Sequence, residues 1–183
     1  MNRRTVLLGV TLSLGCDEPD PRGPTGVAEV LVSATDWVPV DPIEDPFADR
    51  PATFACPEPT RTVEYLNGEP ALEVVTGACE YLAVGQPSLV DIEPGDRIDL
   101  RIWHFDLTAP EPAEAHVAVV VGDTVPWERV VEVPSAAGLI TTSWIADEPV
   151  PIGTLIQHHL HNHGVNEWAL FELTRTIPPF EGP

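Results

Sequence analysis

Short apolar runs separated by turn residues dominate this chain, and they predict β-strands rather than helices. A strand is expected where β-branched, aromatic and polar residues alternate over a few positions, with Gly, Pro, Asn or Asp ending each run. The segments that fit are residues 27–32, 62–66, 71–75, 79–84, 97–107, 115–121, 129–133, 139–145, 155–161 and 167–173. No segment sustains a helical period. Breaks fall roughly every 8–12 residues, a spacing typical of an all-β sandwich.

The predicted fold is therefore an antiparallel β-sandwich, jelly-roll-like, in a single domain over residues 26–178, with a tail over residues 179–183. The pair Asn67-Gly68 separates two of the strands and predicts a tight hairpin, because both residues tolerate positive φ. Proline is frequent, at 21 of 183 residues, which favours short strands and turns over helices.

The N-terminus predicts export. Arg3 and Arg4 are followed by residues 5–14, which are uncharged and mostly apolar. This run is shorter than the roughly 20 residues that cross a bilayer, and it has the length of a signal-peptide core. The pair of arginines also resembles part of a twin-arginine export signal, so the export route stays open.

The sequence LSLGC at positions 12–16 resembles the lipobox of bacterial lipoproteins, although Ser13 stands where that family usually has an aliphatic residue. The resemblance implies a signal peptide over residues 1–15, cleavage before Cys16 and lipidation of its thiol. Several acyl chains would then hold the protein to a membrane in the cell envelope. Residues 16–25 contain no apolar anchor beyond that cysteine and are expected to form a flexible tether. The alternative is a plain secretory signal with a chance cysteine.

Charge excludes one class of partner. The formal net charge is −20, and removal of residues 1–15 would take away Arg3 and Arg4 but no acid. A surface this negative repels phosphate backbones, so nucleic-acid binding is not expected. It also repels anionic lipid headgroups, so membrane attachment would depend on the lipid.

Cys56 and Cys79 are expected to form a disulfide, because exported proteins enter an oxidising compartment. The bond would contribute on the order of 3 kcal/mol in the chain-entropy model. A metal site shared by cysteine and histidine is the alternative. The Pro- and Asp-rich residues 38–51 are expected to form a solvated loop, and their acids match no known calcium-loop spacing.

All six histidines lie between positions 104 and 163, and four of them fall within residues 158–163. If residues 155–161 form a strand, side chains alternate between its two faces. Ile156, His158 and Leu160 then share one face, which the aliphatic residues mark as the core side. His159 and His161 project together from the other face.

Two imidazoles two positions apart on a strand can chelate one transition metal, copper or zinc. The further candidate ligands lie in the following turn and on other strands. The complete predicted set is His159, His161, His163, His116 and His104. The competing hypothesis is that the sequence HNHG at positions 161–164 is a turn whose side chains bond to the backbone.

The sequence GTLIQHHLHNHG at positions 153–164 resembles a histidine-bearing strand of the copper type II, ascorbate-dependent monooxygenases. Those enzymes are jelly-roll sandwiches, and AHVAV at positions 115–119 resembles their double-histidine strand. Only His116 stands where that family has two adjacent histidines, and the single methionine would be lost with the signal. The resemblance therefore implies a single-copper binding module rather than a hydroxylase.

No serine lies in a nucleophile elbow, no glycine-rich phosphate loop occurs, and no pair of carboxylates is marked as acid and base. Among the five tryptophans, Trp103 and Trp168 are expected in the core, so a sugar-stacking face is a minor hypothesis. The predicted function is a non-catalytic envelope module that binds an unidentified ligand or supports an assembly, with a protein or a glycan as the candidate partner. The alternative is a copper- or zinc-binding module, and a metal-dependent enzyme comes third.

Overall fold

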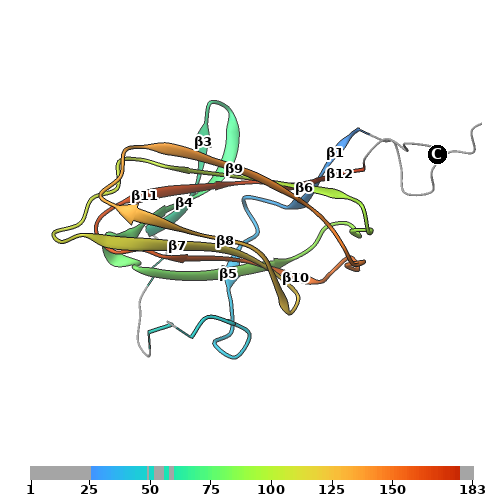
Figure 1. Ribbon diagram of the computed structural model, residues 1–183, viewed down its shortest axis with the longest axis horizontal. Helices are drawn as coiled ribbons and strands as arrows, with labels where there is room; N and C mark the ends of the chain where they lie inside the picture. Colours follow the sequence, from blue (N-terminus) through green and yellow to red (C-terminus); the bar gives the residue numbers. More distant parts are fainter. Residues whose placement is uncertain (1–25, 49, 52–55, 58–59, 178–183) are drawn as a thin grey trace, which may run out of the picture.

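The computed structural model describes residues 26–48, 50–51, 56–57 and 60–177, and within them the chain forms two antiparallel sheets that face each other (Figure 1). The predicted signal, Cys16 and the tether lie outside the described residues, as do residues 178–183, so those hypotheses remain predictions. No helix in the described part of the chain is long and apolar enough to cross a membrane.

The first sheet has seven strands, with β6 near its middle. Its strands are β1 (Ala28–Val32), β3 (Arg61–Leu66), β4 (Glu69–Val75), β6 (Arg97–His104), β9 (Gly138–Ile145), β11 (Glu167–Phe171) and β12 (Leu173–Thr176). β6 pairs with β9 along one side and with β11 and β12 along the other. β4 and then β3 continue the sheet beyond β11, while β1 lies beside β12.

The second sheet has five strands in the order β2-β5-β10-β7-β8. Their bounds are Val38–Pro39 for β2, Tyr81–Pro87 for β5, Leu155–His161 for β10, Ala113–Val121 for β7 and Thr124–Val133 for β8. β10 is the central strand, and β5 and β7 flank it. The antiparallel β-sandwich predicted from the sequence is thus confirmed.

Each predicted strand is present, and the differences lie at strand ends. The Asn67-Gly68 hairpin is confirmed, with φ of 54° and 88° at the two residues. β6 ends at His104, three residues before the predicted end. The predicted strand 167–173 divides into β11 and the beginning of β12, which continues to Thr176.

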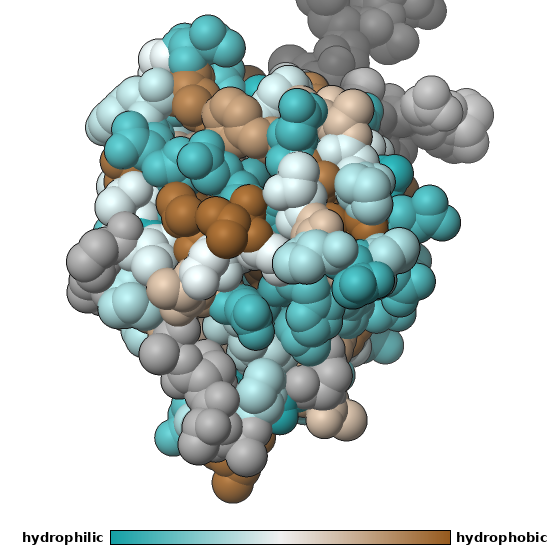
Figure 2. Space-filling model, turned by 90° about the vertical axis from the view of Figure 1, so that its left-hand side faces the viewer, coloured by the Kyte–Doolittle hydropathy of each residue, from teal (hydrophilic) through white to brown (hydrophobic). Residues whose placement is uncertain are grey.

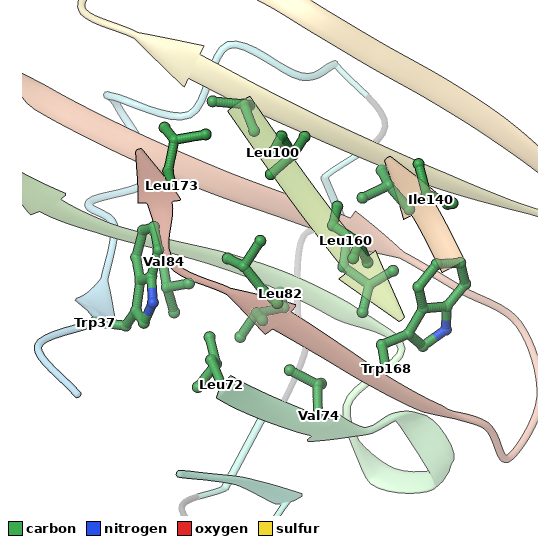
Figure 3. Close-up of a cluster of buried hydrophobic side chains, with 14 of the residues drawn as sticks. Trp37, Leu72, Val74, Leu82, Val84, Leu100, Ile140, Leu160, Trp168 and Leu173 are labelled. Atoms are coloured by element: carbon green, nitrogen blue, oxygen red, sulfur yellow. The ribbon is translucent and has the colours of Figure 1, made fainter. Parts of the chain in front are cut away.

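The core lies between the sheets and takes side chains from both (Figure 3). Leu100, Ile140 and Trp168 come from the first sheet and meet Leu82 and Leu160 of the second. Burial of each such side chain contributes about 1.5–3 kcal/mol, and alternation along each strand directs these residues inward. The predicted burial of Trp168 is confirmed, and its indole N–H donates to Asn162 Oδ1 at 3.2 Å.

The predicted disulfide between Cys56 and Cys79 is present. Cys79 follows a 3₁₀ turn, Thr76–Ala78, and is fully buried against the core. The bond therefore fixes the chain before β3 to the chain between β4 and β5.

The described part of residues 41–51 (the 41–51 segment) is a largely exposed loop, as expected, but it is anchored on the outer face of the five-stranded sheet through a few partly buried side chains. Phe47 stacks on His159, and Gln157 Nε2 donates to the carbonyl of Glu44 at 3.0 Å. The Asp45 carboxylate accepts hydrogen bonds from Tyr81 Oη and Arg50 Nη1, each at 2.6 Å. These anchoring contacts were not predicted, because they join residues far apart in the chain and no local pattern reveals them. In Figure 1 the segment lies below β5.

Candidate binding face and histidine cluster

The alternation predicted for β10 is confirmed. Ile156 and Leu160 belong to the core between the sheets, and His158 lies on the same side, almost fully buried beside Trp37. Burial, followed by the neighbouring His159, lowers the pKa of His158 to about 3. His158 is therefore a neutral core histidine at physiological pH.

His159 and His161 point to the opposite face, as predicted, but His159 is not open to solvent. Its side chain is buried, with the residue only 1% exposed. The Phe47 ring stacks on it at a centroid distance of 4.1 Å, and the Tyr81 and His116 rings lie 5.0 and 4.9 Å away. The histidine is thus held beneath the 41–51 segment.

The remaining histidines of this face lie close to His159 or to one another. The centroid of the His161 ring lies 5.4 Å from that of the Tyr81 ring and 4.9 Å from that of the His163 ring. His116 is the register partner of His161 on β7, and its Nε2 is 3.1 Å from Glu128 Oε2. The structure therefore brings together four of the five predicted ligands.

His104 is the exception. It lies on β6 in the other sheet and faces the core, where its ring centroid is 4.9 Å from that of Trp168. Its Nδ1 is 2.9 Å from the carbonyl oxygen of Phe105. Among the residues that the structure describes, no three His, Cys, Asp or Glu side chains are placed to hold a metal ion. Copper or zinc binding stays a prediction, and His104 is too far from the cluster to contribute to it as placed.

A different feature appears on the outer face of the seven-stranded sheet, where Trp103 lies partly exposed. Trp103 was expected in the core, and this expectation was wrong. Along β6 the buried residues are Ile98, Leu100, Ile102 and His104, so the residues between them point outward. Arg101 shares the face of Trp103, and its charge was the signal that could have corrected the assignment.

Trp103 packs on a small apolar floor formed by Ala71, Ala169 and Phe171. The two alanines leave room for the indole to lie across the neighbouring strands, since Ala169 is the register partner of Trp103 on β11. Phe105, which is 39% exposed, meets Trp103 edge-on with ring centroids 6.1 Å apart. We call Trp103, Phe105 and Phe171 the aromatic platform.

Charged side chains border the aromatic platform. The Arg101 guanidinium lies over the Phe171 ring, 4.9 Å from its centroid, and forms an ion pair with Glu69 at 2.8 Å. Glu73 is the register partner of Ala169 on the far side from Trp103. Burial raises the pKa of Glu73, with further contributions from the charges of Glu64 and Glu167. Hydrogen-bond donors and acceptors thus surround an aromatic surface.

The platform reaches the end of the sandwich at which β6 ends and β11 begins. Figure 2 views the molecule from the left-hand side of Figure 1 and shows an apolar patch with polar side chains around it. Phe105 and Val165 are exposed large apolar residues in the segments at this end. Such patches on a protein surface frequently mark interaction sites.

No protein-family model matches this sequence, and no curated protein matches it. Solved structures with a similar arrangement include the carbohydrate-binding module TmCBM61 in complex with β-1,4-galactotriose. Its TM-score is 0.44 at 11% identity, over 79% of this chain and 90% of that chain. A family 16 carbohydrate-binding module has a TM-score of 0.40 at 12% identity, over 64% of this chain and 85% of that one.

An exo-β-agarase has a TM-score of 0.37 at 12% identity, over 66% of this chain and 22% of that chain. This chain therefore spans about a fifth of that enzyme.

Proposed function

We propose that this chain is a non-catalytic module that binds a glycan on the outer face of its seven-stranded sheet, and that a lipid on Cys16 holds it in the cell envelope. The observation that carries the proposal is the position of Trp103, which stands partly exposed on a regular strand. Its neighbours Ala169 and Phe171 support the ring from below.

A partly exposed indole on a rigid strand suits a sugar ring. The C–H groups on one face of a pyranose are weakly positive, and the face of an aromatic ring is negative, so the two surfaces attract and exclude water. Because β6 pairs with strands on both sides, Trp103 is held in place before any ligand arrives. Such preorganisation lowers the entropic cost of binding.

Sugars also need partners for their hydroxyl groups, and the border of the platform supplies them. Carboxylates accept hydrogen bonds and the guanidinium donates them, so Glu69, Glu73 and Arg101 together match a group that does both. Hydrogen bonds to charged groups are stronger than those between neutral ones.

Anchoring in the envelope is supported by the sequence of the first 16 residues and by the disulfide between Cys56 and Cys79, which fits an oxidising compartment. A module held at the cell surface or in the periplasm would meet polysaccharides of the envelope or its surroundings.

The test is a titration of the mature lipoprotein, purified from membranes in detergent, against cello-, manno-, xylo- and β-1,4-galacto-oligosaccharides. We expect saturable binding to at least one series, and Trp103→Ala is expected to weaken it about tenfold, which corresponds to about 1.4 kcal/mol. Tyr65→Ala is the matched control, since Tyr65 is an exposed aromatic on β3 that points away from the platform.

Absence of binding to every series, or equal binding by Trp103→Ala and the parent protein, would overturn the proposal. The same samples are to be analysed for new reducing ends. Their release would replace the non-catalytic assignment with hydrolysis.

A further inference from the structure

The outer face of the seven-stranded sheet also carries a polar cleft next to the aromatic platform. The cleft has a volume of about 420 Å³, within the range of small-molecule sites. Its polar lining comes from β6, β9 and β12 and from Glu172 just before β12, and it includes Arg97, Asp99, Thr141, Ser143, Glu172 and Thr174. Three strands therefore build it.

Register explains why these side chains meet. Asp99 on β6 lies between Ser143 on β9 and Thr174 on β12, and all three are register partners. One step along β6, Arg101 is paired with Thr141. Short hydroxyl side chains on both neighbours of β6 leave the surface hollow at this point.

Arg101 belongs to both features. Its side chain lines the cleft, and its guanidinium lies over Phe171 of the aromatic platform. The cleft and the platform are therefore contiguous, and a ligand longer than one sugar ring can contact both.

We propose, resting on the glycan-binding function above, that the cleft is a second sugar subsite and that the face selects an uncharged, hydroxyl-rich chain. The hydroxyls of Thr141, Ser143 and Thr174 both donate and accept hydrogen bonds, as sugar hydroxyls do.

The charges of the face argue against an anionic ligand. Its two arginines are already neutralised, Arg97 by Asp99 at 2.7 Å and Arg101 by Glu69 at 2.8 Å. Further carboxylates on this face or lining its cleft are Glu64, Glu73, Glu167 and Glu172. A uronate or sulfate group would therefore enter a region of net negative charge with both guanidinium groups paired.

The cleft can be filled without touching the platform. Ser143 is exposed and points outward from β9, so Ser143→Leu places a larger apolar side chain in the cleft. Thr124→Leu is the matched control, because Thr124 is an exposed strand residue of the other sheet.

Titrations of the mature protein with cello- and manno-oligosaccharides of two to six units test the second subsite. In the parent protein, affinity is expected to rise about tenfold between the disaccharide and the tetrasaccharide, as linked subsites require. Ser143→Leu is expected to lose most of that rise and to retain disaccharide binding, whereas Thr124→Leu keeps both.

If Ser143→Leu shows the same length dependence as the parent, the subsite is wrong while glycan binding stands. If the parent binds none of the cello-, manno-, xylo- or β-1,4-galacto-oligosaccharides, both proposals fail.

Charge selection is tested with the matched β-1,4-linked glucuronate and mannuronate tetramers. These are expected to bind at least about tenfold more weakly at low salt, with a smaller difference at high salt. Equal or tighter binding of the uronates would overturn it.

Discussion

Phe47 stacks on His159 with ring centroids 4.1 Å apart, and this contact fixes an otherwise irregular segment to the central strand of a sheet. Ala83 and Ala118 are the register partners of His159 on the two adjacent strands. Their small side chains leave the space in which Phe47 packs. The segment is further held by Asp45, which is bonded to Tyr81 and Arg50.

Phe47→Ala is therefore expected to release residues 41–51 from the sheet while the sandwich persists. Because Phe47 is only partly buried, the loss of stability is expected at about 1–3 kcal/mol. Hydrogen exchange should accelerate in residues 41–51 and at β10. Ile43→Ala is the control, since Ile43 is 90% exposed and its removal should change neither quantity. Unchanged exchange in the segment would contradict the role of Phe47.

A second prediction concerns acid stability. Burial lowers the pKa of His158 to about 3, against 6.5 for an ordinary histidine. Between these values the unfolded chain binds a proton that the folded chain does not, so this residue lowers the free energy of unfolding as the pH falls. Through this residue the free energy of unfolding falls by about 1.4 kcal/mol for each pH unit below pH 6.5. Well above pH 6.5 the residue causes no such loss.

The measurement is denaturant unfolding at pH 7.5 and pH 5. His158→Leu should lose about 2 kcal/mol less than the parent between these two conditions, because the titrating group is gone. His163→Gln is the control, as His163 is exposed. Equal losses in the parent and His158→Leu would show that His158 is protonated in the folded protein.

These residues also show how far the sequence could go. Alternation placed His158 inward and His159 outward, because apolar neighbours at every second position mark the core side of a strand. It could not show that residues 41–51 cover the outward face, since Phe47 is one aromatic residue in a segment without period. Nor could it assign strands to sheets, so His104 was grouped with histidines that lie on the other side of the sandwich.

Trp103 is a different case, because its position was readable. Arg97, Asp99 and Arg101 alternate with aliphatic residues along the same strand, so the charged side is the outer one and includes Trp103. Tryptophan generally lies in the core of a sandwich, but the local pattern of this strand overrides that tendency at Trp103. The cleft beside it depends on three strands brought together by the fold, which a single sequence does not reveal.

Metal binding by the histidine cluster gives a third prediction. If the histidine cluster binds a metal ion, loading the mature protein with Cu(II) or Zn(II) followed by dialysis should leave about one metal ion per chain. His159→Ala and His161→Ala should each lower that value, and His104→Ala should not, because His104 lies in the other sheet. Elemental mass spectrometry provides the measurement. Less than about a tenth of a metal per chain would contradict the hypothesis.

Glu73 supplies a fourth prediction. Burial and the charges of Glu64 and Glu167 raise its pKa, so its ionised form is disfavoured in the folded protein. Its favourable contribution is therefore present at acid pH and lost as the pH rises through the folded pKa. Glu73→Gln is expected to raise the free energy of unfolding slightly at pH 7, by less than about 1 kcal/mol because the site is partly solvated.

At a pH below 4 the same substitution should give no gain, because the parent carboxyl is then protonated. Glu114→Gln is the control on the other sheet, at a strand position exposed to solvent. A gain at pH 7 that persists unchanged in acid would attribute the effect to packing rather than to charge.

The lipid anchor is tested independently of the sandwich. Cys16 is predicted to carry the acyl chains, so the parent protein should partition into the detergent phase of Triton X-114 and into the membrane fraction. The Cys16→Ala protein should be absent from the detergent phase and the membrane fraction, or its signal should remain uncleaved. The Cys56→Ala protein should still enter the detergent phase, although its disulfide is lost. Because the net charge of the chain is −20, the domain itself has no electrostatic attraction to anionic headgroups. Membrane association of a cleaved Cys16→Ala chain would therefore require a different mode of attachment, and the lipoprotein assignment would be wrong.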